Sequence, residues 1–194
     1  MKKLFLTAAA DRAAFDAKFA ERTANPLPKT YLDQCQVYGF AIGGELVGGY
    51  LVNMQAPFRY TDMIPPAYRD TPHTRHFLAE GRTVELGCMW LDQRRINNLR
   101  RTRIYLSAVV DAMRVRRGWI VAGSVSEKIA RIHKIGFRQM IYAGPTTFPG
   151  APYGEIYAAR AHELAVRFPA GLAFRVGYGY RRETPAWPVR SDAS

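Results

Sequence analysis

One stretch, residues 83–137, constrains the fold more than any other part of the sequence. It opens with the segment TVELGCMWLD, in which Glu85 is the only charged residue before Asp92. Such an apolar run is typical of a strand that is buried on both faces of a sheet. An arginine-rich turn, a long helix from about Asn98, a second strand at Trp119–Ala122 and a short helix follow. Because a helix joins the two strands, we expect them to be parallel neighbours.

Arginines crowd the junction between the first strand and the long helix, at Arg94, Arg95, Arg100, Arg101 and Arg103. A helix N-terminus carries unpaired N–H groups and a partial positive charge, so cations oppose its dipole whereas an anion is stabilised there. The arrangement therefore predicts a phosphate-bearing ligand at this junction. A solvated basic face is the alternative that the same residues allow.

The overall charge also favours an acidic partner, because 28 basic against 16 acidic residues give a net charge of +12. A nucleic acid is the weaker hypothesis, since the arginines gather at one junction and no recognition motif accompanies them. The length of 194 residues and the apolar fraction of 48% predict one globular domain over residues 1–180, followed by a mobile tail over residues 181–194. The sequence has no apolar run of about 18 residues, so we expect no membrane span. Cys35 and Cys88 give no disulfide framework, which favours the cytoplasm.

The sequence before residue 83 predicts a short strand, a helix and a hairpin, and then an irregular cover. Asp11 is a candidate cap for the first helix, and Gly43-Gly44 is a candidate hairpin turn. The cover contains one predicted short helix, and we expect it to lie over a substrate cleft. The pair His73 and His76 favours a surface role over a metal site. The predicted ranges are Lys2–Ala8, a helix up to Asn25, Lys29–Gln34, Gln36–Ile42, Glu45–Met54 and the cover at Gln55–Arg82.

The sequence within and after the central stretch predicts further boundaries. Arg117-Gly118 is expected to end the long helix, Ser126 to cap the short one, and Gly136 to end it in the left-handed conformation. The core is expected to contain Val84, Leu86, Met89, Val109, Met113, Ile120 and Phe137. Two strands are predicted at Phe137–Tyr142 and Gly154–Ala159, and the loop between them is expected to form the wall of a pocket. A helix is predicted at Ala161–Phe168 and a last strand at Phe174–Tyr180.

The order of these elements resembles that of the GNAT superfamily of N-acyltransferases over most of residues 2–160. The segment VELGCMWL at Val84–Leu91 resembles the family's glutamate-bearing central strand. The turn at Arg94–Arg103 stands where the family holds a CoA pyrophosphate, and EKIARIHKIGF at Glu127–Phe137 resembles its closing helix with a terminal Gly-Phe. The resemblance implies an α/β (α+β) fold. It consists of a mixed, mostly antiparallel twisted sheet flanked by helices, with the two parallel strands splayed at one end.

The resemblance also implies a donor site for a CoA thioester, either acetyl-CoA or a longer acyl-CoA. The residues carried over to that site are Leu91, Arg94, Arg95, Asn97, Asn98, Leu99, Arg100, Arg101, Arg103 and Ser126. The family's phosphate loop usually reads Arg/Gln-x-x-Gly-x-Gly/Ala, whereas Asn98 and Arg100 replace its two small residues here. Arg100 either hinders the approach of a pyrophosphate to the backbone or binds it through bidentate hydrogen bonds. The phosphopantetheine of an acyl carrier protein therefore stays open as the donor.

N-acylation needs a polarised thioester carbonyl, an amine that loses a proton and a thiol that leaves. Backbone N–H groups of the central strand can polarise the carbonyl. Glu85 is the candidate general base, because burial would raise its pKa, and a structural ion pair with an arginine is the alternative. A buried structural thiol is favoured over a nucleophile for Cys88. The family's frequent tyrosine acid falls at Ile132, so His133 is expected to point elsewhere.

The leading hypothesis is an N-acyltransferase that acts on an amine acceptor, either a small molecule or a peptide, without a metal. N-acyl amino acid synthases, acyl-homoserine lactone synthases and enzymes that acylate ribosomal peptides are loosely similar branches. A catalytically silent GNAT-like binding protein and a basic nucleic-acid-binding module are the alternatives.

Overall fold

The computed structural model describes residues 1–148 and 150–178, and the strands in this part of the chain form one seven-stranded sheet. Its strand order is β1-β2-β3-β4-β5-β7-β6. All neighbouring strands are antiparallel except β4 and β5, which are parallel. The predicted mixed, mostly antiparallel sheet is therefore confirmed. The strands are β1 (Lys2–Phe5), β2 (Cys35–Ile42), β3 (Glu45–Asn53), β4 (Thr83–Leu91), β5 (Trp119–Ser124), β6 (Gln139–Pro145) and β7 (Tyr153–Ala159).

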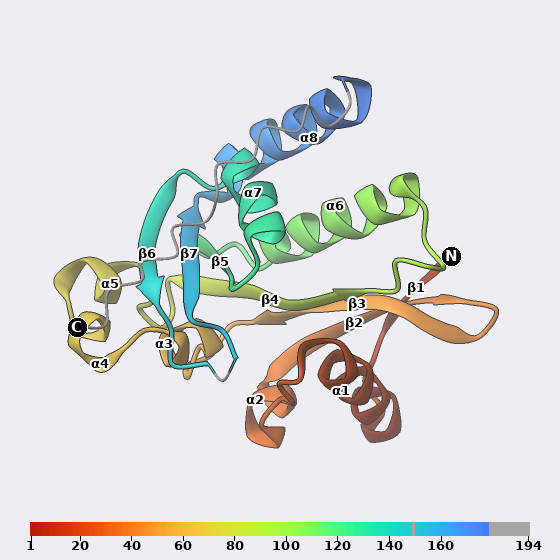
Figure 1. Ribbon diagram of the computed structural model, residues 1–194, viewed down its shortest axis with the longest axis horizontal. Coiled ribbons are helices and arrows are strands. Elements are labelled where there is room, and N and C mark those ends of the chain that lie inside the picture. The colour runs from red at the N-terminus through yellow and green to blue at the C-terminus, as the bar shows by residue number, and fades with distance from the viewer. Residues whose placement is uncertain (149, 179–194) are drawn as a thin grey trace.

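Helices cover both faces of the sheet and one of its ends (Figure 1). On one face lie α6 (Asn98–Arg114), α7 (Glu127–Gly136) and α8 (Ala161–Tyr178), and on the other lie α1 (Ala9–Thr23) and α2 (Lys29–Gln34). The end carries α3 (Arg59–Met63), α4 (Pro66–Arg69) and α5 (Pro72–Phe77). None of the helices in the described ranges combines the length and the apolar content needed to cross a bilayer.

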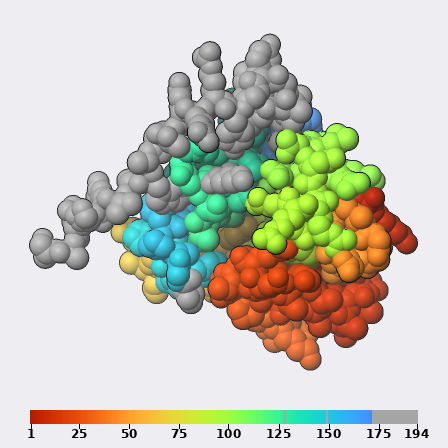
Figure 2. All heavy atoms as spheres, turned by 45° about the vertical axis from the view of Figure 1, so that its right-hand side comes forward, coloured from red at the N-terminus to blue at the C-terminus, as the bar shows by residue number. Residues whose placement is uncertain are grey.

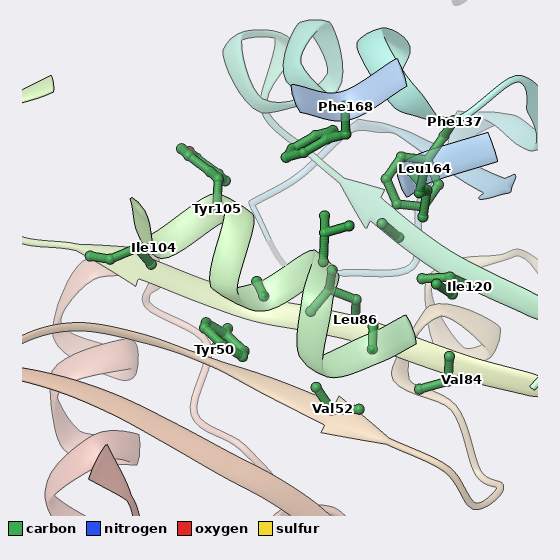
Figure 3. Packing of buried hydrophobic residues seen from close by; sticks show 14 of the residues in the cluster. Tyr50, Val52, Val84, Leu86, Ile104, Tyr105, Ile120, Phe137, Leu164 and Phe168 are labelled. Carbon is green, nitrogen blue, oxygen red and sulfur yellow. The ribbon is translucent and has the colours of Figure 1, made fainter. Parts of the chain in front are cut away.

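The largest core lies between the sheet and α6, where Ile104 and Ala108 are fully buried (Figure 3). Apolar residues recur along α6 at helical spacing and give it one buried stripe. Most of the predicted core is confirmed, since Val84, Leu86, Val109, Ile120 and Phe137 are buried. Met89 and Met113 are only half-buried. Met89 faces a cavity, and Met113 lies in the last turn of α6.

Three predicted helix boundaries are wrong for local reasons. The first helix starts at Ala9 after Ala8, so Asp11 lies in its first turn and does not cap it. α6 ends at Arg114, and Arg116, not Gly118, adopts the left-handed backbone with a φ of 56°. Gly136 stays inside α7, because a Cβ there would lie 2.7 Å from Leu164 and 2.9 Å from Phe168. Close packing against α8 therefore accounts for this glycine.

The cover and the C-terminal segment also differ from the prediction. The cover contains three short helices, α3 to α5, where one was expected. α8 continues through Pro169 to Tyr178, so the strand predicted from Phe174 is wrong over its described part. The end of that predicted strand and the predicted mobile tail over residues 181–194 lie outside the described residues.

Candidate active site

The two parallel strands part at the middle of the sheet, as the sequence predicts. β4 pairs with β5 only over Thr83–Glu85, opposite Trp119–Val121. Beyond this point β4 contains a bulge. Gly87 pairs with Leu51 on β3, and Trp90 pairs with Gly49. Two residues of β4, Cys88 and Met89, therefore lie opposite the single β3 residue between Gly49 and Leu51. Cys88 takes a φ of 50°, which bends the strand. The ladder therefore ends and a gap opens between the strands.

The side chain of Tyr60, from α3, fills the base of this gap. Its hydroxyl donates to the carbonyl of Leu86 on β4 at 3.0 Å and accepts a backbone hydrogen bond from Gly123 on β5. A Cβ at Gly87 would lie 2.8 Å from the hydroxyl, and one at Gly123 would lie 2.8 Å from the ring. Glycines at these two positions leave room for the phenol, which bridges the strands where their ladder ends.

Glu85 lies beneath Tyr60 and is only 1% exposed. Its carboxylate accepts hydrogen bonds from the Tyr31 hydroxyl at 2.8 Å, the Tyr60 N–H at 2.8 Å, the Arg59 N–H at 3.1 Å and the Asn53 amide at 3.4 Å. Burial raises the pKa of Glu85, although these hydrogen bonds oppose the rise. Among the described residues no arginine pairs with it. The carboxylate thus anchors the first residues of α3, and its role as a base stays a prediction.

An apolar cavity of about 290 Å³ occupies the gap. One end lies among α6, α7 and α8, where Tyr105 of α6 and Phe168 of α8, both labelled in Figure 3, line the cavity. The other end lies among α1, α3 and the β6–β7 loop, so the cavity is lined from both faces of the sheet. Phe148 and Ala151 contribute to this wall, which confirms that the loop lines a pocket.

A cleft of about 850 Å³ joins this cavity along the end of β4. It runs between α1, the start of α6 and α7, which meet on one face of the molecule (Figure 2). Four of the predicted donor-contact residues line it, namely Leu91, Arg94, Arg101 and Ser126. The cleft and the cavity are continuous because they share Thr23, Met89, Tyr105, Ser126, Ile129 and Ile132.

The other predicted donor-contact residues lie outside the lining of this cleft. Asn97 caps α6 by accepting the N–H of Arg100 at 3.0 Å, and Arg100 also donates to the carbonyl of Arg95 at 3.5 Å. Arg95 itself pairs with Glu45 on the β2–β3 hairpin. Exposed Asn98 follows the cap. Leu99 and Arg103 line a separate depression beside α6. The arginine cluster is therefore divided between two surfaces.

Arg59 is one of the site residues that the sequence did not single out, together with Tyr60, Tyr31 and Asn53. It is 9% exposed, lines the cavity, and places its guanidinium 5.7 Å from the Phe19 ring and 5.1 Å from the Phe148 ring. The guanidinium donates to the carbonyl of Asn25 at 3.5 Å. Within residues 1–148 and 150–178 it forms no ion pair with a carboxylate. The only sequence signal was an arginine within an aromatic, proline-rich segment.

Two further titratable residues reach the cavity. His133 lines it, contrary to the expectation that this side chain points elsewhere, and packs near the rings of Phe137 and Tyr157. Burial lowers the pKa of His133 to about 4, and its Nδ1 has no hydrogen-bond partner among the residues that the structure describes. Cys88 also lines the cavity, and burial raises the pKa of its thiol to about 12, which disfavours the nucleophilic thiolate.

The histidines of the cover have other contacts. His73 lies 3.0 Å through Nε2 from the Met140 carbonyl, and His76 packs edge-on against the rings of Phe77 and Trp119. Across the part of the chain that the structure describes, no three potential metal ligands gather at one point.

The sequence matches no family model and no curated protein, whereas solved structures share the fold. FeeM, an N-acyl amino acid synthase from uncultured soil microbes, is 14% identical with a TM-score of 0.67, and the match covers 88% of this chain and 96% of FeeM. The ribosomal-protein-S18-alanine N-acetyltransferase from Escherichia coli is 10% identical with a TM-score of 0.55, covering 82% and 93%. A Bacillus subtilis acetyltransferase in complex with CoA is 14% identical with a TM-score of 0.54, covering 82% and 97%. The chain therefore has the GNAT fold that its sequence resembles.

Proposed function

We propose that the protein is an N-acyltransferase that moves an acyl group from a thioester to an amine. The observation that carries this proposal is the continuity between the arginine-lined cleft and the apolar cavity at the parted strands. A donor with an anionic end and an apolar acyl end fits the two compartments in that order. The shared fold with N-acyl and N-acetyltransferases supports the same reaction class.

The donor's phosphates would lie beside Arg94 and Arg101 at the mouth of the cleft, near the start of α6. Arginine binds phosphate through charge-assisted hydrogen bonds, and the helix N-terminus favours the same anion. The thiol arm would follow β4, because the residues after Glu85 have no ladder partner on β5. Their backbone groups are suited to hold the arm and to polarise the thioester carbonyl.

The acyl group would occupy the apolar end of the cavity. This end is lined by aromatic and aliphatic side chains from β4, α6, α7 and α8 and from Phe137, the residue after α7. They include Leu86, Val109, Ile132 and Phe168. A two-carbon acetyl group would leave much of this surface without a partner, and each further buried CH₂ contributes about 0.8 kcal/mol. The proposed donor therefore carries an acyl chain longer than acetyl.

The reaction requires only the two substrates. The amine nitrogen attacks the thioester carbon, a C–N bond forms, the C–S bond breaks, and the thiolate receives the proton that the amine loses. Glu85 stays our proposed base. Its four hydrogen bonds leave no direct contact with the cavity, so proton transfer would need a relay through its partners.

A thermal-shift series tests the donor and separates the alternative functions. CoA, acetyl-CoA, dodecanoyl-CoA and single-stranded DNA would be compared at one low ionic strength. We expect dodecanoyl-CoA to raise the melting temperature most, because it fills both compartments. Stabilisation by DNA alone would favour the nucleic-acid module, and donor binding without amide formation from any amine would favour the silent binding protein.

The carrier-protein donor has its own signature. If an acyl carrier protein brings the thioester, its binding should weaken steeply between low and moderate salt because an acidic surface meets arginines. Dodecanoyl-CoA would then be a poor substitute in turnover. Equal turnover with both donors, insensitive to salt, would favour free acyl-CoA.

A further inference from the structure

Arg59 is a buried cation without a fixed anion. The residue is 9% exposed, and in the described residues no aspartate or glutamate forms an ion pair with its side chain. By contrast, Arg22, Arg75, Arg95, Arg114 and Arg131 each pair with a carboxylate although all are more exposed. The most buried of these arginines is therefore the one that lacks such a partner.

The protein groups around Arg59 compensate its charge only in part. The rings of Phe19 and Phe148 offer cation–π contacts, and the Asn25 carbonyl accepts one hydrogen bond at 3.5 Å. A guanidinium has five N–H donors in a planar fork that matches a carboxylate. Burying such a group without a counterion is unfavourable, so an anionic ligand at this point would relieve the cost.

The position of Arg59 in the cavity restricts which ligand this is. The guanidinium lies at the end formed by α1, α3 and the β6–β7 loop, whereas Arg94 and Arg101 line the cleft at the end of β4. The donor's phosphates would therefore bind Arg94 and Arg101, which leaves Arg59 for a different anionic group. Glu85 holds the backbone N–H of Arg59 and of Tyr60, and the Tyr60 side chain lies where the strands part. Arg59 is thus fixed beside the gap where the acyl carbonyl would lie.

We propose that Arg59 binds the carboxylate of the amine acceptor, so that the acceptor is a free amino acid. This inference rests on the proposed N-acyltransferase function and names its second substrate class. An α-amino acid carries its amine two bonds from its carboxylate carbon. A bidentate Arg59–carboxylate pair would therefore hold the nitrogen at a fixed distance from the guanidinium, on the side of the parted strands. The rings of Phe19 and Phe148 give this end an apolar wall for the acceptor's side chain.

Matched acceptors test this assignment. Leucine, leucinamide and 3-methylbutylamine share a side chain but differ at the carboxylate, and N-acyl product from dodecanoyl-CoA would be measured by mass spectrometry. We expect the wild type to prefer leucine over both analogues by about 10²-fold in kcat/KM, because a site built around a charged pair rejects ligands that leave it unpaired. The same comparison with phenylalanine, phenylalaninamide and phenethylamine covers aromatic acceptors.

Variants of Arg59 should remove this preference selectively. Arg59→Met keeps length and apolar volume, and we expect it to lower kcat/KM for leucine by about 10²-fold while leucinamide changes by less than about threefold. For Arg59→Lys we expect a kcat/KM for leucine between those of the wild type and Arg59→Met, because lysine keeps the charge and lacks the planar fork of the guanidinium. Arg75→Met, on the exposed face of α5, removes one positive charge from the same cover and is the matched control.

Two outcomes would overturn the assignment while leaving the proposed function intact. One is equal acylation of leucine, leucinamide and 3-methylbutylamine by the wild type. The other is an equal loss for all acceptors in Arg59→Met together with a lower melting temperature, which would indicate a packing role.

A binding measurement covers the case in which no amine is acylated and the proposed function fails. N-dodecanoyl-leucine should stabilise the wild type more than N-dodecanoyl-leucinamide, and Arg59→Met should abolish the difference. Equal stabilisation of the wild type by the acid and the amide would overturn the carboxylate site.

Discussion

The arginines at the start of α6 and the single arginine at the start of α3 have opposite environments. Those of α6 are numerous and mostly exposed, and Arg95 and Arg100 bind neighbouring parts of the protein. Arg59 is alone and buried, and no described carboxylate neutralises it. Water and salt screen exposed charges, whereas a charge in a cavity retains most of its interaction energy. From this contrast we expect burial and a missing counterion to indicate a ligand contact better than the number of charges does.

The two regions also differ in what holds them. Arg100, Arg101 and Arg103 sit on a regular helix capped by Asn97, so each can change without moving the others. Arg59 and Tyr60 form the first turn of a five-residue helix whose cap residue, Phe58, provides no side-chain hydrogen bond. Glu85 supplies the missing acceptor from β4, and Tyr60 in turn bridges β4 and β5. The interior site is therefore a coupled unit, and changes there should have larger effects than changes on α6.

The largest effect is expected for Glu85→Gln. An amide cannot accept both backbone N–H groups and the Tyr31 hydroxyl as the carboxylate does, so at least one buried donor loses its acceptor. We expect the free energy of unfolding to fall by about 2–3 kcal/mol, with turnover reduced by about 10²-fold because Arg59 and Tyr60 shift.

Thermal melting and steady-state kinetics check this together, with the exposed Glu45→Gln as control. A 10²-fold loss of turnover at an unchanged melting temperature would instead identify Glu85 as the base and leave the anchoring role without support. A variant as stable and active as the wild type would contradict both roles.

The next effect separates the arginines of α6 from one another. Arg94 and Arg101 line the cleft, whereas Arg100 and Arg103 do not. We expect Arg94→Glu with Arg101→Glu to raise the KM for dodecanoyl-CoA by at least about tenfold, while Arg100→Glu with Arg103→Glu changes it by about twofold. The KM for the amine should change little in either pair. Equal effects of the two pairs would show that only the net charge of this surface matters.

Most of the correct fold prediction came from the central stretch of the sequence, residues 83–137. An apolar strand, a helix and a second strand imply a parallel pair, and this order is what β4, α6 and β5 show. Periodicity along α6 was long enough to predict its buried stripe, and Gly43-Gly44 was enough to predict a hairpin turn with two positive φ angles. Regular segments with many repeated signals are thus predictable from local sequence.

The cover and the site residues were not predictable in this way. α3 exists because a carboxylate 26 positions later in the chain binds its first N–H groups, and no local pattern records this contact. The same holds for Gly136, whose small size is required by α8 and not by a helix end. His133 was misplaced because a register carried over from a family does not describe how this helix packs. These are tertiary contacts that override local preference.

A moderate effect is expected from His133, which tests the interior without touching Arg59. Burial lowers the pKa of His133 to about 4, so its neutral form is favoured in the folded protein. The associated stability is present above the unfolded pKa of about 6.5 and is lost as the pH falls from there towards 4. We expect the wild type to lose about 1–2 kcal/mol more than His133→Gln between pH 7 and pH 4.5, measured by urea unfolding. His76→Gln, at an exposed histidine, is the control, and parallel curves for the wild type and His133→Gln would contradict the lowered pKa of His133.

The smallest effect is expected at the exposed ion pair between Arg95 and Glu45, which joins the turn before α6 to the β2–β3 hairpin. Glu45 is 72% exposed and Arg95 is 38% exposed, so water and salt screen their attraction while both side chains lose freedom in the pair. A double-mutant cycle with Arg95→Gln and Glu45→Gln should give a coupling of about 0.2–1 kcal/mol that decreases at high salt. Because neither residue lines the cleft, the KM for the donor should stay within about twofold in all three variants. A coupling above about 2 kcal/mol, or a tenfold rise in KM, would mean that this surface acts as one unit with the cleft, and the contrast between exposed and buried arginines would fail.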